Sequence, residues 1–368
     1  MFSEMTRLGF RKLLWLLLFW VAYIQLVNIC IYLYLGHFGT SSEIKTMIPE
    51  YDFQRETLVS VIMASIGAIL FGSLEIFYLK AFSKKSFLWN ILVKGLFYLC
   101  FIVILSIIGS LAYNSTDLNQ PFWHRNVIRS MLEYMASSGA IYNYITISMG
   151  ILISLFLIQI DLKLGQNGLW YLVTGQYHQP KEEKRVFMFL DLKSSTIIAE
   201  RIGHVKYFEL LNDFFADATP HIINNQGTIY QYIGDEITIS WPAKAGFDLA
   251  KSIQCYFDIE SEIDRRRHYY EQQYGLVPSF KAGAHAGQVT TGQIGIIKKE
   301  LVHSGDVLNA ASRIQGLCNR YNTRLIVSGQ VIQFLTHQSK WDFLALGDIE
   351  LRGKEEKLEL FRVELKDQ

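Results

Sequence analysis

Two aspartates stand at the ends of apolar segments that lie far apart in the chain. Asp191 follows the run "RVFMFL" (185–190), and Asp235 lies between two short apolar segments in "TIYQYIGDEITISW" (228–241). Such runs are typical of strands buried in a sheet. If the two strands are neighbours, the carboxylates converge and repel each other unless a cation lies between them. Carboxylate oxygens with room for water suit Mg²⁺ or Mn²⁺, so we expect a metal site here.

Each aspartate, taken alone, could also be an ordinary turn acid at a strand end. Glu236 follows Asp235 directly. Because successive side chains of a strand point to opposite faces, we expect Glu236 to point away from the metal, and we do not count it as a ligand.

Three hydroxyl residues that favour helix starts follow the first aspartate: Ser194, Ser195 and Thr196. Apolar residues then recur at helical spacing between Ile197 and Leu211. The backbone N–H groups of a helix that begins so close to a strand end form a cradle for phosphate. These residues are therefore expected beside a phosphorylated substrate.

A second polar pair lies in "SGDVLNAASRIQGLCNRY" (304–321), where apolar residues recur at helical spacing. Asn309 and Arg313 are one turn apart and share a helix face. Such a pair can hold a ribose oxygen and neutralise charge on a phosphate. The alternative is an ordinary exposed polar face.

The remaining soluble segments predict a small mixed sheet. "FKAGAHAGQVTTG" (280–292) is a strand whose Gly283 and Gly287 permit close packing. His285 has no partner at ligand spacing, so we interpret it as a buried structural histidine. "TRLIVSG" is a further strand, and the segment 344–365 indicates a closing hairpin with Arg352 and Lys354 near its turn, where two solvated cations are the alternative.

The first 160 residues are too apolar for a soluble domain, and the whole chain is 50% hydrophobic. Four segments are long enough to cross a bilayer, which takes about 20 apolar residues: roughly 13–36, 57–79, 88–113 and 141–160. The polar, Gly- and Pro-containing residues 161–184 indicate a linker, so residues 1–160 form a membrane domain and residues 185–368 a separate α/β domain.

Basic residues near the ends of these segments predict their orientation. They are Arg7, Arg11 and Lys12 before the first segment, and Lys80, Lys84 and Lys85 between the second and third. Both groups should face the cytoplasm, which puts the N-terminus and everything after residue 160 on that side of a cell membrane.

Charges within the apolar segments are few. Glu75 and Lys94 should snorkel or form one ion pair, and an ion path is the alternative, although no ladder of ionisable groups accompanies them. The four cysteines lack metal-ligand or disulfide spacing, which indicates free thiols. A net charge of +1 gives no support to a nucleic-acid partner.

Together, these segments resemble the class III nucleotide cyclases, the adenylate and guanylate cyclases. "FLDLKSST" and "YIGDEITISW" are similar to the two metal motifs of that family, "AGAHAG" to its Gly-x-His-x-Gly strand, "SGDVLNAASR" to its Asn-x-x-x-Arg signature and "LRGK" to its terminal loop. The motifs follow the family's order over about residues 185–365. The resemblance implies an α/β (α+β) domain with a palm-like ββαβ core and a mixed, largely antiparallel sheet flanked by helices. Here that domain follows an α-helical membrane domain.

The resemblance also implies a reaction. The 3′-oxygen of a nucleoside triphosphate attacks the α-phosphorus, and pyrophosphate leaves. Asp191 and Asp235 would bind two Mg²⁺ (or Mn²⁺) ions, with the backbone carbonyl of Leu192 as an extra ligand. Asn309 would position the ribose, and Arg313 would stabilise charge at the α-phosphate.

The outer phosphates would contact Arg352 or Lys354. Family sites form between two cyclase domains, with the metals on one and the Asn/Arg pair on the other. The resemblance therefore implies a homodimer with two equivalent sites at its interface.

Two positions depart from the family pattern. Where members that use ATP carry Lys and those that use GTP carry Glu, this chain has Gln231, which offers both a donor and an acceptor. The partner position is Val302, whose side chain cannot hydrogen-bond a base, although His303 or Ser304 could replace it after a register shift. A donor toward adenine N1 favours ATP, with GTP and a pyrimidine triphosphate left open.

The sequence therefore predicts a membrane-anchored cyclase that makes a 3′,5′-cyclic nucleotide, most simply cyclic AMP, for signalling. A non-catalytic nucleotide sensor is the alternative that Gln231 and Val302 suggest. A diguanylate cyclase is a third reading, because "IGDEI" is similar to the hairpin of that family, but the Asn309/Arg313 helix and the "LRGK" tail argue against it. A transporter or channel has the least support.

Overall fold

The computed structural model describes residues 4–38, 53–78, 86–166, 168–244, 247–333, 335, 340–351 and 357–366. The chain divides into two compact units: Thr6–Leu169 forms the first, and Trp170–Gln368 together with Met1–Met5 forms the second.

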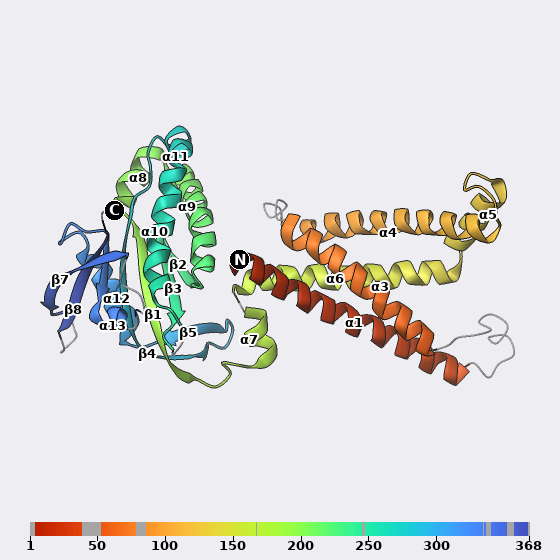
Figure 1. The fold of residues 1–368 in the computed structure, drawn as a ribbon, viewed down its shortest axis with the longest axis horizontal. Coiled ribbons are helices and arrows are strands. Elements are labelled where there is room, and N and C mark those ends of the chain that lie inside the picture. The colour runs from red at the N-terminus through yellow and green to blue at the C-terminus, as the bar shows by residue number, and fades with distance from the viewer. Residues whose placement is uncertain are drawn as a thin grey trace. The chain divides into compact units, whose positions relative to one another are not determined.

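The first unit is helical (Figure 1). Its elements are α1 (Glu4–Phe38), α3 (Phe53–Ser73), a π-helical turn η1 (Leu74–Tyr78), α4 (Phe87–Asp117), α5 (Arg125–Met135) and α6 (Ser138–Leu164). Four stretches are long and apolar enough to cross a membrane: Thr6–Leu33, Thr57–Ile76, Phe87–Asp117 and Ser138–Leu164. All four predicted segments overlap these helices. The basic residues Lys80, Lys84 and Lys85 lie outside the described residues.

Large apolar side chains cover the outside of this unit as well as its inside. Leu58, Met63, Leu96 and Ile145 are more than half exposed, whereas Trp20, Phe71, Tyr98, Ile151 and Leu155 form the core. A surface this apolar is expected to face lipid rather than water. A short helix that was not predicted from the sequence, α5, lies between the last two spans and buries Val127 and Met131.

The two charged side chains within the apolar segments form a buried ion pair. Lys94 on α4 contacts Glu75 on the π-helical turn, and the hydroxyl of Tyr98 donates to the second Glu75 oxygen at 3.2 Å. All three side chains are buried. The predicted ion pair is therefore present, and it joins the end of the second span to the third.

Removing one partner of this pair should destabilise the helical unit. Lys94→Met leaves a carboxylate buried without its cation, and we expect about 3–5 kcal/mol lower stability. Thermal unfolding of the whole protein in detergent measures the change. The double variant Glu75→Gln/Lys94→Met removes both charges and should recover most of the loss, and a double variant no more stable than Lys94→Met would contradict this account.

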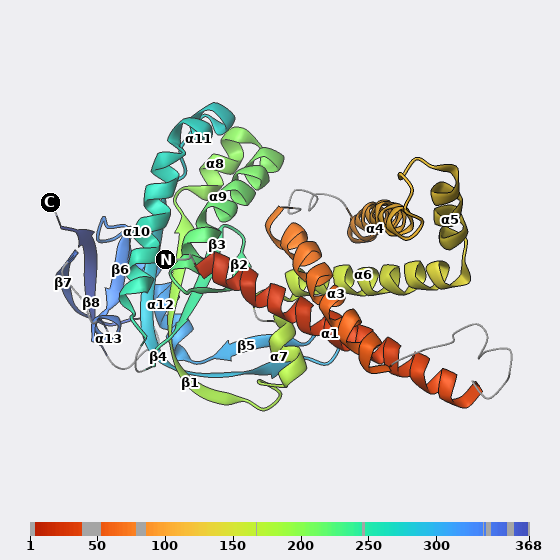
Figure 2. The same cartoon turned by 45° about the vertical axis from the view of Figure 1, so that its right-hand side comes forward.

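The second unit contains one eight-stranded mixed sheet. Its strands are β1 (Lys181–Leu192), β2 (Thr228–Ile233), β3 (Glu236–Pro242), β4 (Phe280–Ile294), β5 (Glu300–Ser304), β6 (Leu325–Ser328), β7 (Trp341–Ile349) and β8 (Leu358–Leu365). The strand order across the sheet is β2-β3-β1-β4-β6-β8-β7 (Figure 2). Strand β5 lies outside this order and pairs with β4. All pairs are antiparallel except β4 with β6.

Helices cover both faces of the sheet. They are α8 (Ser195–Ile202), α9 (His204–Asn224), α10 (Ala250–Arg265), α11 (Arg267–Tyr274), α12 (Asp306–Leu317) and α13 (Gly329–Ile332), whereas α7 (Gly168–Thr174) precedes the sheet and buries no residue. Alternate residues of β1 divide between the faces: Val186, Met188 and Leu190 pack in the core with α9 and α10, while Phe187 and Phe189 pack with α12. Asp191 continues the second series and so lies on the α12 face. A helical segment followed by a mixed sheet flanked by helices confirms the predicted fold class.

Two glycines of β4 let α12 lie directly on the strand. A Cβ at Gly283 would lie 2.1 Å from the backbone nitrogen of Gln315, and one at Gly287 would lie 2.6 Å from Val307. Any larger residue would push the helix off the sheet. His285, between them on the same strand, is buried, and its Nδ1 is 2.8 Å from the Ser328 hydroxyl, as expected of a structural histidine.

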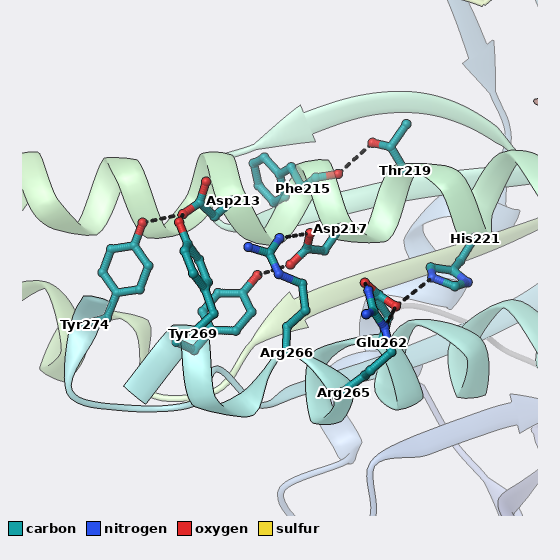
Figure 3. Close-up of polar contacts among 11 residues, drawn as sticks. Asp213, Phe215, Asp217, Thr219, His221, Glu262, Arg265, Arg266, Tyr269 and Tyr274 are labelled. Atoms are coloured by element: carbon teal, nitrogen blue, oxygen red, sulfur yellow. Dashed lines mark hydrogen bonds and ion pairs between the residues drawn. The ribbon is translucent and has the colours of Figure 1, made fainter. Parts of the chain in front are cut away.

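A polar network holds α9 against α10 and α11 (Figure 3). Asp213 accepts hydrogen bonds from Tyr269 and Tyr274, each at 2.6 Å. One turn later, Asp217 contacts the Arg266 guanidinium and accepts a 2.6 Å hydrogen bond from Tyr270. Burial and the Asp217 carboxylate raise the pKa of Tyr270, so this hydroxyl keeps its proton and remains a donor. The network therefore fixes the helices behind the sheet rather than serving chemistry.

Candidate active site

The structure brings the two predicted metal-binding aspartates together. Strands β1 and β3 are antiparallel neighbours, and Asp191 lies opposite Glu236, the first residue after the turn. Gly234 has a φ of +62°, a conformation that only glycine adopts freely, and the resulting tight turn carries Asp235. The Asp235 carboxyl group lies within hydrogen-bonding reach of Asp191. Two acids from distant parts of the sequence therefore share one end of the sheet.

Burial and the nearby Asp235 charge raise the pKa of Asp191. Two neighbours offset part of this effect: the amide of Gln315 donates to Asp191 Oδ2 at 2.8 Å, and Lys281 Nζ lies 3.5 Å from the same oxygen. One lysine does not neutralise two carboxylates. The site therefore holds an excess of negative charge that a divalent cation would balance.

The prediction that Glu236 points away from this site is wrong. Glu236 is the cross-strand partner of Asp191, and directly paired residues share a face. Burial and the charges of Asp191 and Asp235 raise the pKa of Glu236 to about 7. The alternation rule failed because Asp235 belongs to the turn, so its side chain does not set the direction of the next one.

The donor set fits a hard cation that also binds substrate. Among the described residues, no group of three acidic, histidine or cysteine side chains is close enough to hold a metal ion. Mg²⁺ usually takes one or two carboxylates and completes its coordination with water and substrate phosphates. Asp191 and Asp235 match that arrangement, whereas a closed structural metal site would need more protein ligands.

The residues after Asp191 form the expected strand-to-helix connection. Leu192 is the last residue of β1, and α8 begins at Ser195 after Ser194 in a left-handed conformation, with φ of +58°. Ser195 is half-buried at the start of this helix. Ser194 and Thr196 are exposed. The predicted roles of these hydroxyls in phosphate binding, and of the Leu192 carbonyl in metal binding, stay predictions.

The side of α12 that contacts Asp191 and the opposite side of this helix carry different polar side chains. Gln315 is buried against Asp191, whereas Asn309 is exposed and Arg313 is half-buried. Residues two apart on a helix point roughly 200° from each other, so Arg313 points away from the aspartate that Gln315 contacts. Within the described parts of the chain, the side chains of Asn309 and Arg313 make no hydrogen bond or ion pair. Gln315 and Arg313 therefore lie on opposite sides of this helix, and the predicted roles of Asn309 and Arg313 stay predictions.

The register of β2 puts Gln231 on the α12 face, whereas that of β5 puts Val302 on the opposite face, because the adjacent His303 packs with Phe187 and Tyr230. Gln231 on β2 is half-buried and opposite Thr238, and Val302 on β5 is opposite Gly292. The backbone N–H of His303 donates to the Tyr230 hydroxyl at 3.3 Å, which links β2 to β5 beside these positions.

His303 is not available to replace Val302 in this conformation. Its ring is buried against Phe187 and Tyr230, and Nδ1 is 2.7 Å from the Thr291 hydroxyl. Burial, aided by the Arg185 charge, lowers the pKa of His303 to about 3. Ser304 is exposed at the end of β5. Arg352 and Lys354 lie outside the described residues.

Sequence analysis missed three residues of the site: Lys281, Gln315 and the paired Glu236. Lys281 and Gln315 become neighbours of Asp191 only through the register of β1 with β4 and the packing of α12. Neither residue belongs to a motif, so only the three-dimensional arrangement identifies them.

Comparisons with known proteins agree with this geometry. A family model described as "Adenylate and Guanylate cyclase catalytic domain" matches residues 177–364. Adenylate cyclase 2 of Rhizobium meliloti (strain 1021) is 30% identical over 256 residues, which are 70% of this chain and 66% of that protein. An adenylate cyclase of Anabaena cylindrica is 24% identical over 186 residues, which are 49% of this chain and 36% of that protein.

A solved structure shares the fold. A bacterial light-regulated adenylyl cyclase superposes with a TM-score of 0.51 at 22% identity, covering 57% of this chain and 61% of that one. The predicted resemblance is confirmed, because the family model covers about half of the chain and includes every motif quoted above. The chain belongs to the family of adenylate and guanylate cyclase catalytic domains.

Proposed function

We propose that this protein is a membrane-anchored adenylate cyclase, which converts ATP to 3′,5′-cyclic AMP and pyrophosphate. The observation that carries the proposal is the convergence of Asp191 and Asp235 at one end of the sheet. The similarity to adenylate cyclases of Rhizobium meliloti and Anabaena cylindrica supports ATP as the substrate.

Asp191 and Asp235 would hold the divalent cations, which lower the pKa of the ribose 3′-hydroxyl and neutralise the triphosphate. Lys281 and Gln315 hold the Asp191 carboxylate from the other side and fix its direction. Asn309 positions the ribose, and the Arg313 guanidinium stabilises the negative charge that develops at the α-phosphate. Arg352 and Lys354 are proposed to contact the outer phosphates.

We further propose that the active form is a homodimer with two sites at the interface. Arg313 points away from the Asp191 of its own chain, and Asn309 lies one turn before it on the same helix face, so both would serve the aspartates of a second copy. Several apolar side chains of the catalytic unit that are more than half exposed also support association: Ile197, Val205, Phe208, Ile233, Ile296 and Ile297.

The four apolar helices would anchor the protein in a cell membrane with both ends in the cytoplasm. Lys12, near the start of α1, forms a 2.6 Å ion pair with Asp161, near the end of α6. An even number of spans returns the chain to the side from which it started, which agrees with the orientation expected from Arg7, Arg11 and Lys12.

A product assay tests the proposed activity. The whole protein in detergent, with Mn²⁺ or Mg²⁺ and one triphosphate at a time, should form cyclic AMP from ATP. GTP, CTP and UTP are assayed in the same way. If a dimeric, folded preparation forms no 3′,5′-cyclic product from any of the four triphosphates, the proposed cyclase activity is wrong. In that case, tight nucleotide binding in calorimetry would favour the non-catalytic sensor that Val302 suggests.

A further inference from the structure

Strand β2 contains an irregularity beside the proposed base-binding position. Its pairing with β3 shifts between Ile229 and Gln231, so that Tyr230 is an extra residue. Ile229 packs in the main core, whereas Tyr230 packs on the opposite face with Phe187. Strict alternation would turn Gln231 back toward the core. The bulge instead keeps Gln231 on the same face as Tyr230, which is the α12 face, and bulges near active sites often re-aim a side chain in this way.

The residue opposite Gln231 has an unusual hydroxyl group. Thr238 lies in β3 between Phe189 of β1 and Gln231 of β2, and its side chain is fully buried. Its Oγ1 has no hydrogen-bond partner among the described residues. A buried hydroxyl without a partner is unfavourable, and most such groups in proteins are satisfied. Its cross-strand partner on β2, Gln231, has a polar side chain that can satisfy it after a change of rotamer.

The two ways of pairing these side chains are not equivalent. If the Thr238 O–H donates to Gln231 Oε1, the buried proton is satisfied and the Gln231 amide N–H groups face the base. If Gln231 is flipped, its NH₂ donates to Thr238, and the buried hydroxyl proton has no acceptor. A buried donor without a partner is tolerated less well than an under-used acceptor oxygen. The first arrangement is therefore favoured.

We propose that Thr238 is a specificity-determining residue that orients the Gln231 amide with its N–H groups toward the base and thereby selects adenine. Adenine N1 accepts a hydrogen bond, whereas guanine presents an N–H at the same position. Val302 offers no polar atom from its side chain, so the choice of base depends on the orientation of Gln231. This inference rests on the proposed cyclase function and names the feature that selects its substrate.

Two hydroxyl variants test this role. Thr238→Val keeps the shape of the side chain and removes the hydroxyl, so Gln231 becomes free to flip. We expect the ratio of kcat/KM for ATP to that for GTP to fall by about tenfold, the value of one ordinary hydrogen bond. Thr238→Ser keeps the hydroxyl and should keep the ratio near that of the wild type.

A matched control comes from the same strand. Ser240, two residues further and on the same face, is also fully buried, but its hydroxyl accepts from Arg185 at 2.7 Å. Ser240→Ala should reduce stability without changing the ATP-to-GTP ratio. This separates loss of a buried hydroxyl in general from loss of the one that faces Gln231.

The possible outcomes separate this inference from the proposed function. If Thr238→Val keeps the wild-type ratio while it still forms a cyclic product, or if the wild type prefers GTP, the role of Thr238 is wrong and the cyclase assignment stands. If the wild type forms no cyclic product, the cyclase assignment fails. The inference is then judged by the relative affinities for ATP and GTP analogues in calorimetry, which Thr238→Val should bring closer together.

Discussion

Replacing Asp235 by asparagine should reduce cyclic nucleotide formation by at least about a thousandfold, because the site loses a ligand for the cation that activates the attacking oxygen. The same loss is expected for Asp191→Asn. Turnover of ATP by the purified whole protein with Mn²⁺ measures the effect. Asp264→Asn is a matched control, since this exposed aspartate on α10 pairs only with Arg267 among the described residues, and it should keep full activity.

Although Asp235→Asn should abolish activity, it should not lower the thermal stability of the protein when metal is absent. Burial and the charge of Asp235 raise the pKa of Asp191, which means that the two carboxylates oppose each other in the folded protein. Asp235→Asn removes this repulsion, so its Tm without metal should equal or exceed that of the wild type. Adding Mn²⁺ should raise the Tm of the wild type and not that of the variant. A variant that loses both activity and folding in the absence of metal would contradict a metal-binding role.

Much of the site could be predicted from sequence because its chemistry depends on local patterns. The buried run ending at Asp191, the glycine turn at Asp235 and the Asn309/Arg313 helix each have a recognisable period or spacing, and each forms the predicted element. The small residues Gly283 and Gly287 also indicated a close helix–strand contact, which the structure contains.

The rest depends on register and irregularities that no local pattern encodes. Glu236 was placed on the wrong face because the rule of alternation does not extend through a turn. The bulge at Tyr230 keeps Gln231 on the face from which strict alternation would turn it, and no residue type in β2 predicts this bulge. Gln315 reaches Asp191 only because α12 lies directly on Gly283.

Arg313→Ala should lower turnover by about 10²–10³-fold, the usual effect of removing a group that stabilises transition-state charge. Its fold should be retained, because the side chain makes no hydrogen bond or ion pair within the described residues. The KM for ATP should change much less than kcat, since the guanidinium acts mainly on charge that develops during the reaction.

Co-expression of Arg313→Ala with Asp191→Asn separates a site within one chain from a site between two chains. With random pairing, about half of the dimers are mixed, and each mixed dimer has one intact site that combines the unmodified aspartates of one chain with the unmodified arginine of the other. Activity should therefore recover to about a quarter of that of the wild type. Neither variant expressed alone should show this recovery.

The matched control is co-expression of Asp191→Asn with Asp235→Asn. Both lesions then affect the metal-binding half, so every site in a mixed dimer lacks one aspartate and activity should stay at background. Recovery in the first pair but not in the second requires that the aspartates and Arg313 act across the interface. Background activity in both pairs would mean that the two halves come from the same chain. That result would conflict with the opposite directions of Gln315 and Arg313 on α12, because Gln315 already contacts the Asp191 carboxylate of its own chain.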